Sequence, residues 1–511
     1  MEGMVAFDAL IQGFGTVFMP FNFLLSIFAV GAGIMVGALP GLTATMACAL
    51  LVPVTFGLDT VPAFVLLLGI YCGAIYGGSI AGILINIPGT PSAAATMLDG
   101  FAMARKGQAG KALGMACIAS SVAGLISAIF MTFMSPQIAR IALKFGPPEY
   151  FGIALFALSV LVMISGKSLV KGLISAVFGL LLTTIGMDPN TGFDRFTFGS
   201  SNLLGGITLL PAIIGMFAFT QIFEDVDKRK TKTYKTAKIG KIVPSWSELK
   251  RVRTVILKSS LIGSFLGSIP GIGGETGCFV ALGEAKRSSK HPEKFGTGIL
   301  EGVAAPEAGN NGTTGGAMIP MLSLGIPGDA VTAVMLGGLM LHGLTPGPLL
   351  FKTHLDVVYP IFASFILANI FMGIMGLTMA RFYARVINIK KTYLIPSILV
   401  LSIIGSYAIQ FSFFDVGLAL VFGVIGYFMR YYGYPLSPVM IALILGPIAE
   451  QNFCRALMIS HGSFTIFFKS PIFDVFLTLA IASLTFALYQ RKKIVENESA
   501  RQGHETKIEP G

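Results

Sequence analysis

The sequence predicts an all-α polytopic membrane protein with about 12 transmembrane crossings, arranged as two inverted-topology repeats that contain broken, re-entrant segments. Three observations carry this prediction: few charged residues, long uncharged apolar runs, and a glycine- and proline-rich segment that occurs twice. Of the 511 residues, 54% are hydrophobic and 12% are charged, whereas a soluble domain carries about 25% charged residues. Between Asp8 and Asp99 the only charge is Asp59, so each run between these acids exceeds the roughly 20 residues that one span needs.

The first predicted repeat covers residues 20–223 and follows an N-terminal segment, residues 1–19. A span over 20–39 ends in Pro40-Gly41, residues 42–56 run back, and a span over 61–80 follows. The next stretch is GAIYGGSIAGILINIPGTPSAAATMLDG, residues 73–100, in which Gly77-Gly78, Pro88-Gly89 and Pro91 are expected to break the helix. Broken backbone at membrane depth is tolerated only where it is buried in protein or lines a cavity, so this segment predicts a site. Further spans are expected near 112–134, 150–165, 169–186 and 203–223.

The second predicted repeat, residues 259–490, contains the same order of motifs as the first. A basic cytoplasmic linker, 224–258, separates the two repeats, and a charged cytoplasmic tail, 491–511, follows them. Pro40-Gly41 recurs as Pro270-Gly271, 230 residues later, and GTTGGAMIPMLSLGIPGDAVTAVMLGG, residues 312–338, repeats the double glycine, the Ile-Pro-Gly and the closing glycine. Spans are expected near 357–380, 394–411, 414–429, 435–449 and 472–490.

The charges of the connecting loops indicate that the two repeats have opposite orientation. In the first half, the loop around Asp59 has no Lys or Arg, while the loop after residue 100 holds Arg105, Lys106 and Lys111. In the second half the order is reversed, because four basic residues lie between 286 and 294 and none lies between 329 and 350. Positive residues mark the cytoplasmic side, although Arg140 and Lys144 run against this pattern. Inverted repeats with paired interrupted segments are typical of secondary transporters, whose binding site lies at the interruptions.

The two predicted breaks offer chemistry for an anion and for a cation. Backbone N–H groups at the starts of half-helices suit a carboxylate, and carbonyls freed from helix bonding suit Na⁺. No Lys or Arg lies within either break, so an anionic substrate would be held by helix dipoles and a co-bound cation. The predicted substrate- and ion-binding residues are Pro40, Gly41, Thr43, Thr45, Asn86, Pro88, Gly89, Thr90, Pro270, Gly271, Gly273, Gly274, Asn310, Asn311, Thr313, Thr314, Pro327 and Gly328.

The glycine and acidic residues in these segments can have structural roles as well as functional ones. Gly89 and Gly328 would allow close backbone approach and a positive φ, but small residues also serve close helix packing. Glu301 and Glu307 are candidate coupling acids, since acids inside membranes are functional sites by default. Glu275, Asp99 and Asp329 also flank or lie within the breaks, and Asp99 and Asp329 either take part in the same way or cap helices. Ser79, Ser92 and Thr96 add further hydroxyls near the first break.

Several other functions are disfavoured by the sequence. The net charge of +11 lies in loops between apolar runs, as membrane topology requires, and predicts no nucleic-acid partner. Five cysteines without CxxC spacing indicate neither a disulfide framework nor a zinc site. The glycine-rich stretch at 271–277 lacks the Lys-Ser/Thr of a nucleotide loop. A membrane-embedded enzyme remains an alternative, yet no nucleophile–base or metal cluster is visible, and no cofactor is expected.

Four stretches resemble the large membrane subunit of the tripartite tricarboxylate transporter family, TctA. They are VGALPGLTATMACALLVPVTF (36–56), YCGAIYGGSIAGILINIPGTPSAAATMLDG (71–100), KFGTGILEGVAAPEAGNNGTTGGAMIPMLSLGIPGDAVTAVMLGGLMLHGLTPGPLLF (294–351) and EQNFCRALMISHGSF (450–464). Together they follow the order of the family along nearly the whole chain. Asp329 stands where a small residue would be expected after Ile-Pro-Gly, which implies an altered specificity or coupling ion.

The resemblance implies a multi-pass subunit in a prokaryotic inner membrane. It implies import of tricarboxylates such as citrate, or of other organic acid anions, driven by a gradient of Na⁺ or H⁺. The implied partners are a periplasmic solute-binding protein, a small membrane subunit and the lipid bilayer. No metal is implied beyond a transported Na⁺. The alternatives are the large subunit of another tripartite-type transporter and a single-component anion symporter.

Overall fold

The computed structural model describes residues 2–164, 168–227, 237, 239–389 and 391–505. By its internal contacts the chain divides into two compact units. Unit 1 comprises residues 1–144 and 208–431, and unit 2 comprises residues 145–207 and 432–511. Unit 2 therefore takes one segment from each of the two predicted repeats. The predicted linker residues 228–236 and 238, and the tail residues 506–511, lie outside the described residues.

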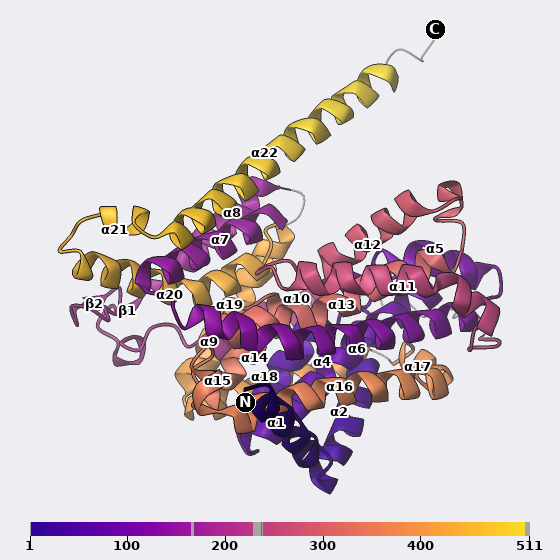
Figure 1. The fold of residues 1–511 in the computed structure, drawn as a ribbon, viewed down its shortest axis with the longest axis horizontal. Coiled ribbons are helices and arrows are strands. Elements are labelled where there is room, and N and C mark those ends of the chain that lie inside the picture. Colours follow the sequence, from indigo (N-terminus) through magenta and orange to yellow (C-terminus); the bar gives the residue numbers. More distant parts are fainter. Residues whose placement is uncertain (1, 165–167, 228–236, 238, 390, 506–511) are drawn as a thin grey trace. The chain divides into compact units, whose positions relative to one another are not determined.

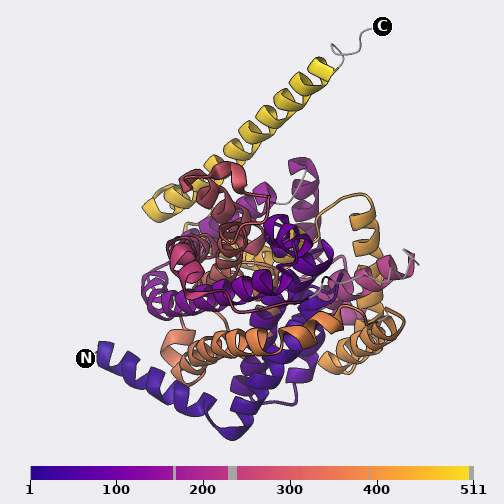
Figure 2. The ribbon, with the colours of Figure 1, turned by 90° about the vertical axis from the view of Figure 1, so that its right-hand side faces the viewer.

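Unit 1 opens with seven helical elements. They are α1 (Glu2–Val17), α2 (Pro20–Ala38), α3 (Ala44–Thr55), α4 (Thr60–Ile85), the 3₁₀ turn η1 (Pro91–Ala93), α5 (Thr96–Arg105) and α6 (Ala109–Ala142). Proline suits the first turn of α2, where no N–H partner is needed. In Figure 2 the indigo α1 ends in a sharp turn before α2. All 22 residues from Ala63 to Leu84 of α4 are buried, so α4 is the central helix of this unit.

The rest of unit 1 comes from the second half of the chain. Its elements are α9 (Leu209–Ile214), the π-helical turn η3 (Gly215–Phe219), α10 (Thr220–Asp227), α11 (Trp246–Gly267), α12 (Gly274–Ser288), η4 (Pro292–Lys294), α13 (Glu301–Leu324), α14 (Ala330–Leu341), α15 (Leu350–Thr353), α16 (Leu355–Thr378), α17 (Ala380–Val386), α18 (Lys391–Gln410) and α19 (Phe413–Tyr431). Helix α11 begins at Trp246, inside the segment predicted as a linker. Ser245 and Glu248 form a capping box that starts it.

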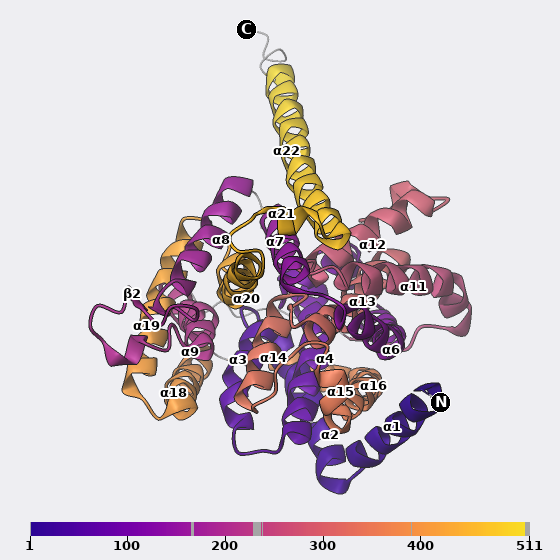
Figure 3. The ribbon, with the colours of Figure 1, turned by 60° about the vertical axis from the view of Figure 1, so that its left-hand side comes forward.

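Unit 2 is a group of four main helices with a short β-hairpin. Its elements are α7 (Pro147–Ile164), α8 (Leu169–Thr183), β1 (Gly186–Met187), β2 (Asp194–Arg195), η2 (Ser201–Leu203), α20 (Ser437–Ile459), α21 (Thr465–Phe468) and α22 (Pro471–Glu505). Helix α20 packs against both α7 and α8, as Figure 3 shows. The two strands pair antiparallel, with Gly186 opposite Arg195 and Met187 opposite Asp194.

The described residues contain eight helices long and apolar enough to cross a membrane, by length and composition. Three shorter apolar helices, Ala44–Thr55, Leu169–Thr183 and Ala330–Leu341, are also present. The all-helical, multi-pass prediction is confirmed, apart from the one two-residue strand pair in this described part. The structure does not show a dozen crossings among the described residues, and the span predicted near 169–186, for example, forms the shorter helix α8 of 15 residues.

Equivalent helices of the two halves make equivalent contacts in unit 1. Helix α2 packs on α4, and α11 packs on α13. Across the halves, α6 packs on α13 while α16 packs on α4 (Figure 1). Glycines permit the α2–α4 contact, since a Cβ at Gly33 would lie 2.9 Å from Ile70 Cα. Each half thus contributes its own helix pair and one helix that crosses to the other half.

The double glycines do not break their helices, contrary to the expectation from sequence. Helix α4 continues through Gly77 and Gly78, and α13 continues through Gly315 and Gly316. A Cβ at Gly77 would overlap the carbonyl oxygen of Ile34, and one at Gly316 would lie 2.9 Å from Gly267 Cα. These glycines therefore serve close helix packing, and both breaks come later in the sequence.

Candidate functional site

The two helix breaks have the same backbone design. Helix α4 ends at Ile85, and Asn86 caps it in the left-handed region with φ 58°. Helix α13 ends at Leu324, and Gly325 caps it with φ 72°. The breaks then read Asn-Ile-Pro-Gly-Thr (86–90) and Gly-Ile-Pro-Gly-Asp (325–329), each without helical structure and each followed by a new helix. Helix interruption at Ile-Pro-Gly, predicted from sequence, is confirmed at both positions.

The glycine of each break lies directly against the backbone of a helix. The Gly89 N–H donates to Gly78 O at 3.0 Å, and a Cβ at Gly89 would overlap Gly37 O. A Cβ at Gly328 would lie 2.5 Å from Ala317 Cα. The positive φ expected at these two glycines is absent; it occurs instead at Gly41 (φ 97°) and Gly271 (φ 87°), the glycines of the Pro-Gly turns. Close approach, and not a left-handed backbone, is what requires glycine at 89 and 328.

Residues of both halves meet at the start of α12. The N-cap of α12 is Gly273, which has no side chain to satisfy the free N–H groups of the first turn. A Cβ built on Gly274 would lie 3.2 Å from Thr313 Oγ1 and 3.3 Å from Ser92 Cβ, and would overlap Asn310 Oδ1. The turn η1 after the first break thereby supplies Ser92, and α13 supplies Asn310 and Thr313, around one helix N-terminus.

Asn310 is the residue of this group whose polar atoms are unused. Its side chain is fully buried, and neither Oδ1 nor Nδ2 has a hydrogen-bond partner within the described chain. A buried amide without partners costs free energy, so native structures rarely contain one unless it serves a ligand or ion. Asn310 therefore offers a donor to an anion and an acceptor to a cation beside the start of α12.

The second break ends in a carboxylate that is already engaged. Asp329 is the N-cap of α14, and its Oδ1 accepts from Thr332 N at 2.7 Å and Thr332 Oγ1 at 2.8 Å. Tyr71 of α4 donates its hydroxyl to Asp329 Oδ2 at 2.7 Å. The break is joined to the start of the α12 region by a 2.8 Å hydrogen bond from Gly271 N to Gly328 O.

Glu307 lies at the centre of a hydroxyl cluster. Its side chain is fully buried in α13, and its Oε1 accepts from Ser79 Oγ of α4 and from Thr96 Oγ1 of α5. Its Oε2 accepts from Ser120 Oγ of α6 at 2.7 Å. Asn311 Nδ2 donates to the same Ser120 Oγ at 2.8 Å and so extends the cluster. All three donors to Glu307 are neutral hydroxyls from the first half of the chain.

Two other acids of these segments have structural partners, whereas the third, Glu275, lies in the first turn of α12. Glu301, at the start of α13, pairs with Arg251 Nε at 2.9 Å. Asp99 is buried, and it accepts from the backbone N–H groups of Gly296 at 2.9 Å and Gly298 at 2.7 Å. Asp99 thus holds the turn that precedes α13. Glu301 and Glu307 therefore occupy different environments, one ion-paired at a helix end and the other among buried hydroxyls.

The remaining predicted residues differ in how available they are. Thr43 uses its hydroxyl to cap α3, accepting from Met46 N at 3.2 Å. The hydroxyls of Thr313 and Thr314 each donate to a carbonyl of their own helix at 2.6 Å. The hydroxyl oxygens of Thr90 and Ser92 lie 3.2 Å apart and form a hydrogen bond. Pro40, Pro88 and Gly41 are partly exposed, Thr45, Pro270 and Pro327 are buried, and Asn86 is exposed.

Sequence reasoning missed two partners of the carboxylates, Tyr71 and Ser120. Both lie in uninterrupted apolar helices, outside the breaks on which the sequence argument rests. The adjacent pair Ser120-Ser121 in an apolar run is the signal that could have pointed to one of them. A hydroxyl inside a membrane helix needs a partner, and its own helix carbonyl or a carboxylate on a neighbouring helix can supply it.

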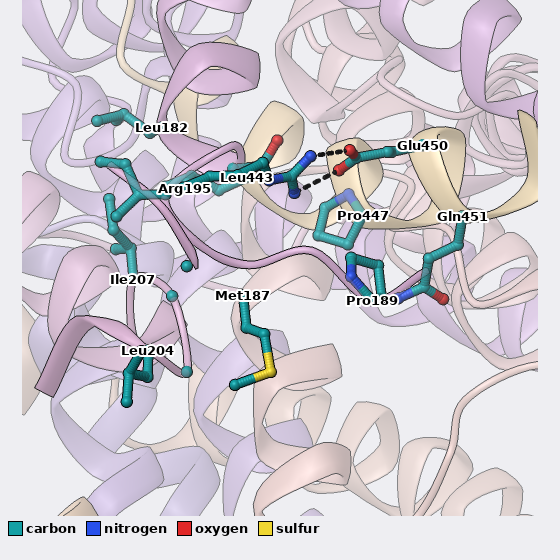
Figure 4. Close-up of a pocket in the computed structure, with 15 residues that line it drawn as sticks. Leu182, Met187, Pro189, Arg195, Leu204, Ile207, Leu443, Pro447, Glu450 and Gln451 are labelled. Carbon is teal, nitrogen blue, oxygen red and sulfur yellow. Dashed lines mark hydrogen bonds and ion pairs between the residues drawn. The ribbon is translucent and has the colours of Figure 1, made fainter. Parts of the chain in front are cut away.

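Unit 2 has a separate cavity of about 310 Å³, shown in Figure 4. The hairpin side of the cavity carries Arg195, and α20 carries Glu450, Pro447 and Gln451. Arg195 and Glu450 form a two-pronged ion pair, and Asp188 lies 3.5 Å from the same guanidinium. The hydrogen bond from Arg195 to Glu450 raises the pKa of Arg195, and the arginine charge is neutralised within the cavity wall. This pair fastens the hairpin to α20 and leaves no net positive charge for an anion.

Comparison with known proteins places the chain in a family. Residues 23–441 match the profile of the tripartite tricarboxylate transporter TctA family. An uncharacterized 52.8 kDa protein in the TAR-I ttuC' 3' region of Agrobacterium vitis is 36% identical over 476 residues, which are 93% of this chain and 95% of the relative. An uncharacterized protein in the TAR-II ttuC' 3' region of the same organism is 35% identical over 226 residues, which are 44% of this chain and 93% of the relative. No solved structure matches the chain.

The match extends over most of the chain, including both helix breaks and the glycine turns before them. The family is one of transporters and not of enzymes. Its tripartite systems combine a large membrane subunit with a small membrane subunit and a binding protein. The chain belongs to the tripartite tricarboxylate transporter TctA family, as a large, multi-pass membrane subunit.

Proposed function

We propose that this subunit imports citrate-like tricarboxylates or other organic acid anions across a prokaryotic inner membrane, driven by a Na⁺ gradient. The substrate is handed over by a periplasmic solute-binding protein, and the small membrane subunit completes the complex. The single observation that carries the proposal is the convergence of Ser92, the unpartnered Asn310 amide and the uncapped start of α12. A helix N-terminus with a free amide donor is a binding site for a carboxylate.

The binding site uses residues of both halves of the chain, as expected for a transporter that exposes one site to either side of the membrane. Ser92 follows the first Ile-Pro-Gly, while Gly273 and Gly274 follow the glycine turn of the second half. No basic side chain is part of this group, so the anion is held by dipoles and amides. A co-bound cation is the natural complement to the anion charge, and Na⁺ fits the oxygen-rich surroundings.

Two loop contacts support opposite orientation of the two halves. His342, after α14, has its Nε2 3.3 Å from Thr55 Oγ1, at the end of α3. On the other side, Lys106, after α5, donates its Nζ to Thr297 O at 2.6 Å, just before α13. The loop that follows α3 in one half thus accompanies the loop that follows α14 in the other. Such pairing is what an inverted repeat produces.

Labelling tests this topology. Single cysteines at 59 and 342, in a background without the five native cysteines, should react with an impermeant reagent from the periplasm. Cysteines at 106 and 287 should react only after the membrane is opened. Equal labelling at 59 and 106 would contradict the inverted orientation.

Uptake in proteoliposomes tests the proposed activity. The complex is reconstituted with both membrane subunits, and labelled citrate is added with the binding protein under an inward Na⁺ gradient and without ATP. We expect uptake that collapses with the gradient and requires the binding protein at low citrate. Asn310→Ala should reduce uptake about tenfold or more, since one bidentate polar partner is lost. Asn369→Ala is the matched control, because Asn369 is an equally buried asparagine whose amide bonds its own helix carbonyl, Phe365 O, at 2.8 Å.

The outcomes separate the alternatives. Uptake that requires ATP and ignores the gradient would contradict secondary transport. Full uptake without the binding protein would indicate a single-component anion symporter. Uptake driven by a proton gradient alone would replace Na⁺ by H⁺ as the coupling ion. Equal uptake by the Asn310 and Asn369 variants would move the site away from α12.

A further inference from the structure

The two breaks differ at the residue that follows Ile-Pro-Gly. The first break has Thr90 and the second has Asp329. Thr90 is buried and neutral, and its hydroxyl lies 3.2 Å from Ser92 Oγ. Asp329 is partly exposed, and it brings a formal negative charge to the start of α14. The backbone design is shared by the two breaks, but only the second carries a negative charge.

Asp329 occupies the place that an anion would take at α14. Its carboxylate accepts the Thr332 backbone N–H in a capping box, which satisfies the first turn of the helix. An external carboxylate would have to displace this internal one and would meet its charge. The N-terminus of α14 is therefore closed to anions, whereas α12 begins at Gly273 with no capping side chain and carries Glu275 in its first turn.

The N-termini of α14 and α12 are neighbours. A Cβ at Gly273 would lie 3.4 Å from Asp329 Cβ. Like charges a few ångströms apart repel strongly in a medium of low dielectric constant. An organic acid at the start of α12 therefore meets the charge of Asp329 unless that charge is compensated. The described side chains that hydrogen-bond Asp329 are Tyr71 and Thr332, both neutral, and Glu275 in the first turn of α12 adds a second negative charge nearby. A bound cation would compensate these carboxylates.

We propose that Asp329 is the carboxylate ligand of a bound Na⁺, and that this ion must be in place before an organic acid anion can bind at the start of α12. The inference rests on the proposed function and extends it, because it assigns the cation dependence to one residue. Three hydrogen bonds use part of the acceptor capacity of the carboxylate, which is about four, so the group can still bind an ion. Tyr71 is a positioning residue, because its hydroxyl fixes Oδ2 of Asp329.

Binding of ²²Na⁺ to the purified complex of both membrane subunits tests this assignment. Asp329→Asn removes the charge and keeps the cap, because asparagine is as good an N-cap as aspartate. We expect ²²Na⁺ affinity to fall about tenfold or more in this variant, since a formal charge leaves the site. Tyr71→Phe should weaken ²²Na⁺ binding by a smaller factor. Asp356→Asn, at an exposed acid in the first turn of α16, is the control and should bind ²²Na⁺ as the wild type does.

Citrate binding, measured with and without Na⁺, distinguishes a charge effect from a general defect. Wild-type citrate binding should require Na⁺, whereas the Asp329→Asn variant should bind citrate equally well without it. If the wild type binds no ²²Na⁺, or if Asp329→Asn keeps the wild-type ²²Na⁺ affinity, the proposal is overturned. Loss of citrate binding in the variant at every Na⁺ concentration would also overturn it. Failure of Na⁺-driven citrate uptake by the wild type would instead refute the proposed function.

Discussion

Substitution of Glu307 tests whether its carboxylate has only a structural role or also couples transport to an ion. In Glu307→Ala, the hydroxyls of Ser79, Thr96 and Ser120 lose their shared acceptor in a fully buried site. Each buried hydroxyl left without a partner costs about 1–3 kcal/mol. The hydroxyls of serine and threonine can instead donate to a carbonyl of their own helix. The free energy of unfolding of Glu307→Ala should therefore fall by about 3 kcal/mol, less than the largest sum for three unpartnered hydroxyls.

Glu307→Gln keeps the shape of the side chain and most of its hydrogen bonds. The amide oxygen can still accept from Ser79 and Thr96, while the NH₂ group can donate to Ser120 Oγ. The expected loss of stability is about 1 kcal/mol, the value of one exchanged hydrogen bond. Uptake should nevertheless fall about tenfold or more, because an acid inside a membrane protein is a functional site by default and glutamine carries no exchangeable charge.

Stability can be followed with a thiol-reactive fluorophore during heating. Cys48, Cys72, Cys117 and Cys278 are buried and free, so their reaction reports the opening of unit 1. The order of melting temperatures should be wild type, then Gln, then Ala. Glu301→Gln is the stability control, since Glu301 is paired with a mostly exposed Arg251 and such pairs contribute less than about 1 kcal/mol. Normal Na⁺-driven uptake by the Glu307→Gln variant would refute a coupling role and leave Glu307 as a packing residue.

Two further predictions follow from other contacts. Gly89→Ala should lower the free energy of unfolding by about 1–3 kcal/mol and reduce uptake, because the added Cβ would overlap Gly37 O. Gly417→Ala is the control: nothing lies within 4 Å of its added Cβ, so it should melt at the same temperature as the wild type. Lys111→Ala should raise the pKa of Glu248 from about 2 toward its usual 4.5, since the Lys111 hydrogen bond is the main cause of the low value. A carboxyl group whose pKa is lowered in the folded protein stabilises the fold at pH values above its unfolded pKa. The wild type should therefore exceed Lys111→Ala in free energy of unfolding by the full difference above pH 4.5, and this difference should vanish as the pH falls through about 2. The fluorescence of Trp246, the only tryptophan, reports unfolding at this helix start, and a pH-independent difference would contradict the pairing.

The sequence was sufficient to predict the helical membrane class, the family and the location of both breaks. Composition and run length decide the class, because the bilayer imposes a span length on the chain. The breaks were predictable at Pro88 and Pro327, because proline removes a backbone donor and cannot continue a helix. The double glycines gave a false signal, since glycine weakens a helix only where packing does not compensate for its flexibility, and Gly77 and Gly316 are closely packed.

The grouping of side chains within the site could not be read from the sequence. Asn310 and Asn311 are adjacent in sequence, but they face different surroundings: one amide is unpartnered and the other bonds Ser120. Neighbouring residues on a helix point about 100° apart, so the choice depends on which helices pack on each face. The contacts of α13 with α6 and with α12 are long-range, and no local pattern encodes them. Ser120 and Tyr71 escaped notice for the same reason.

The hydroxyl cluster around Glu307 restricts which helices can move past one another. Its carboxylate belongs to α13 in the second half, while its donors belong to α4, α5 and α6 in the first half. A simple rocking of one half against the other would tear these buried hydrogen bonds apart in every cycle, at about 1–3 kcal/mol for each orphaned group. The four helices are therefore expected to travel as one rigid body. Any hinge that exposes a site to one side of the membrane or the other is then expected outside these four helices.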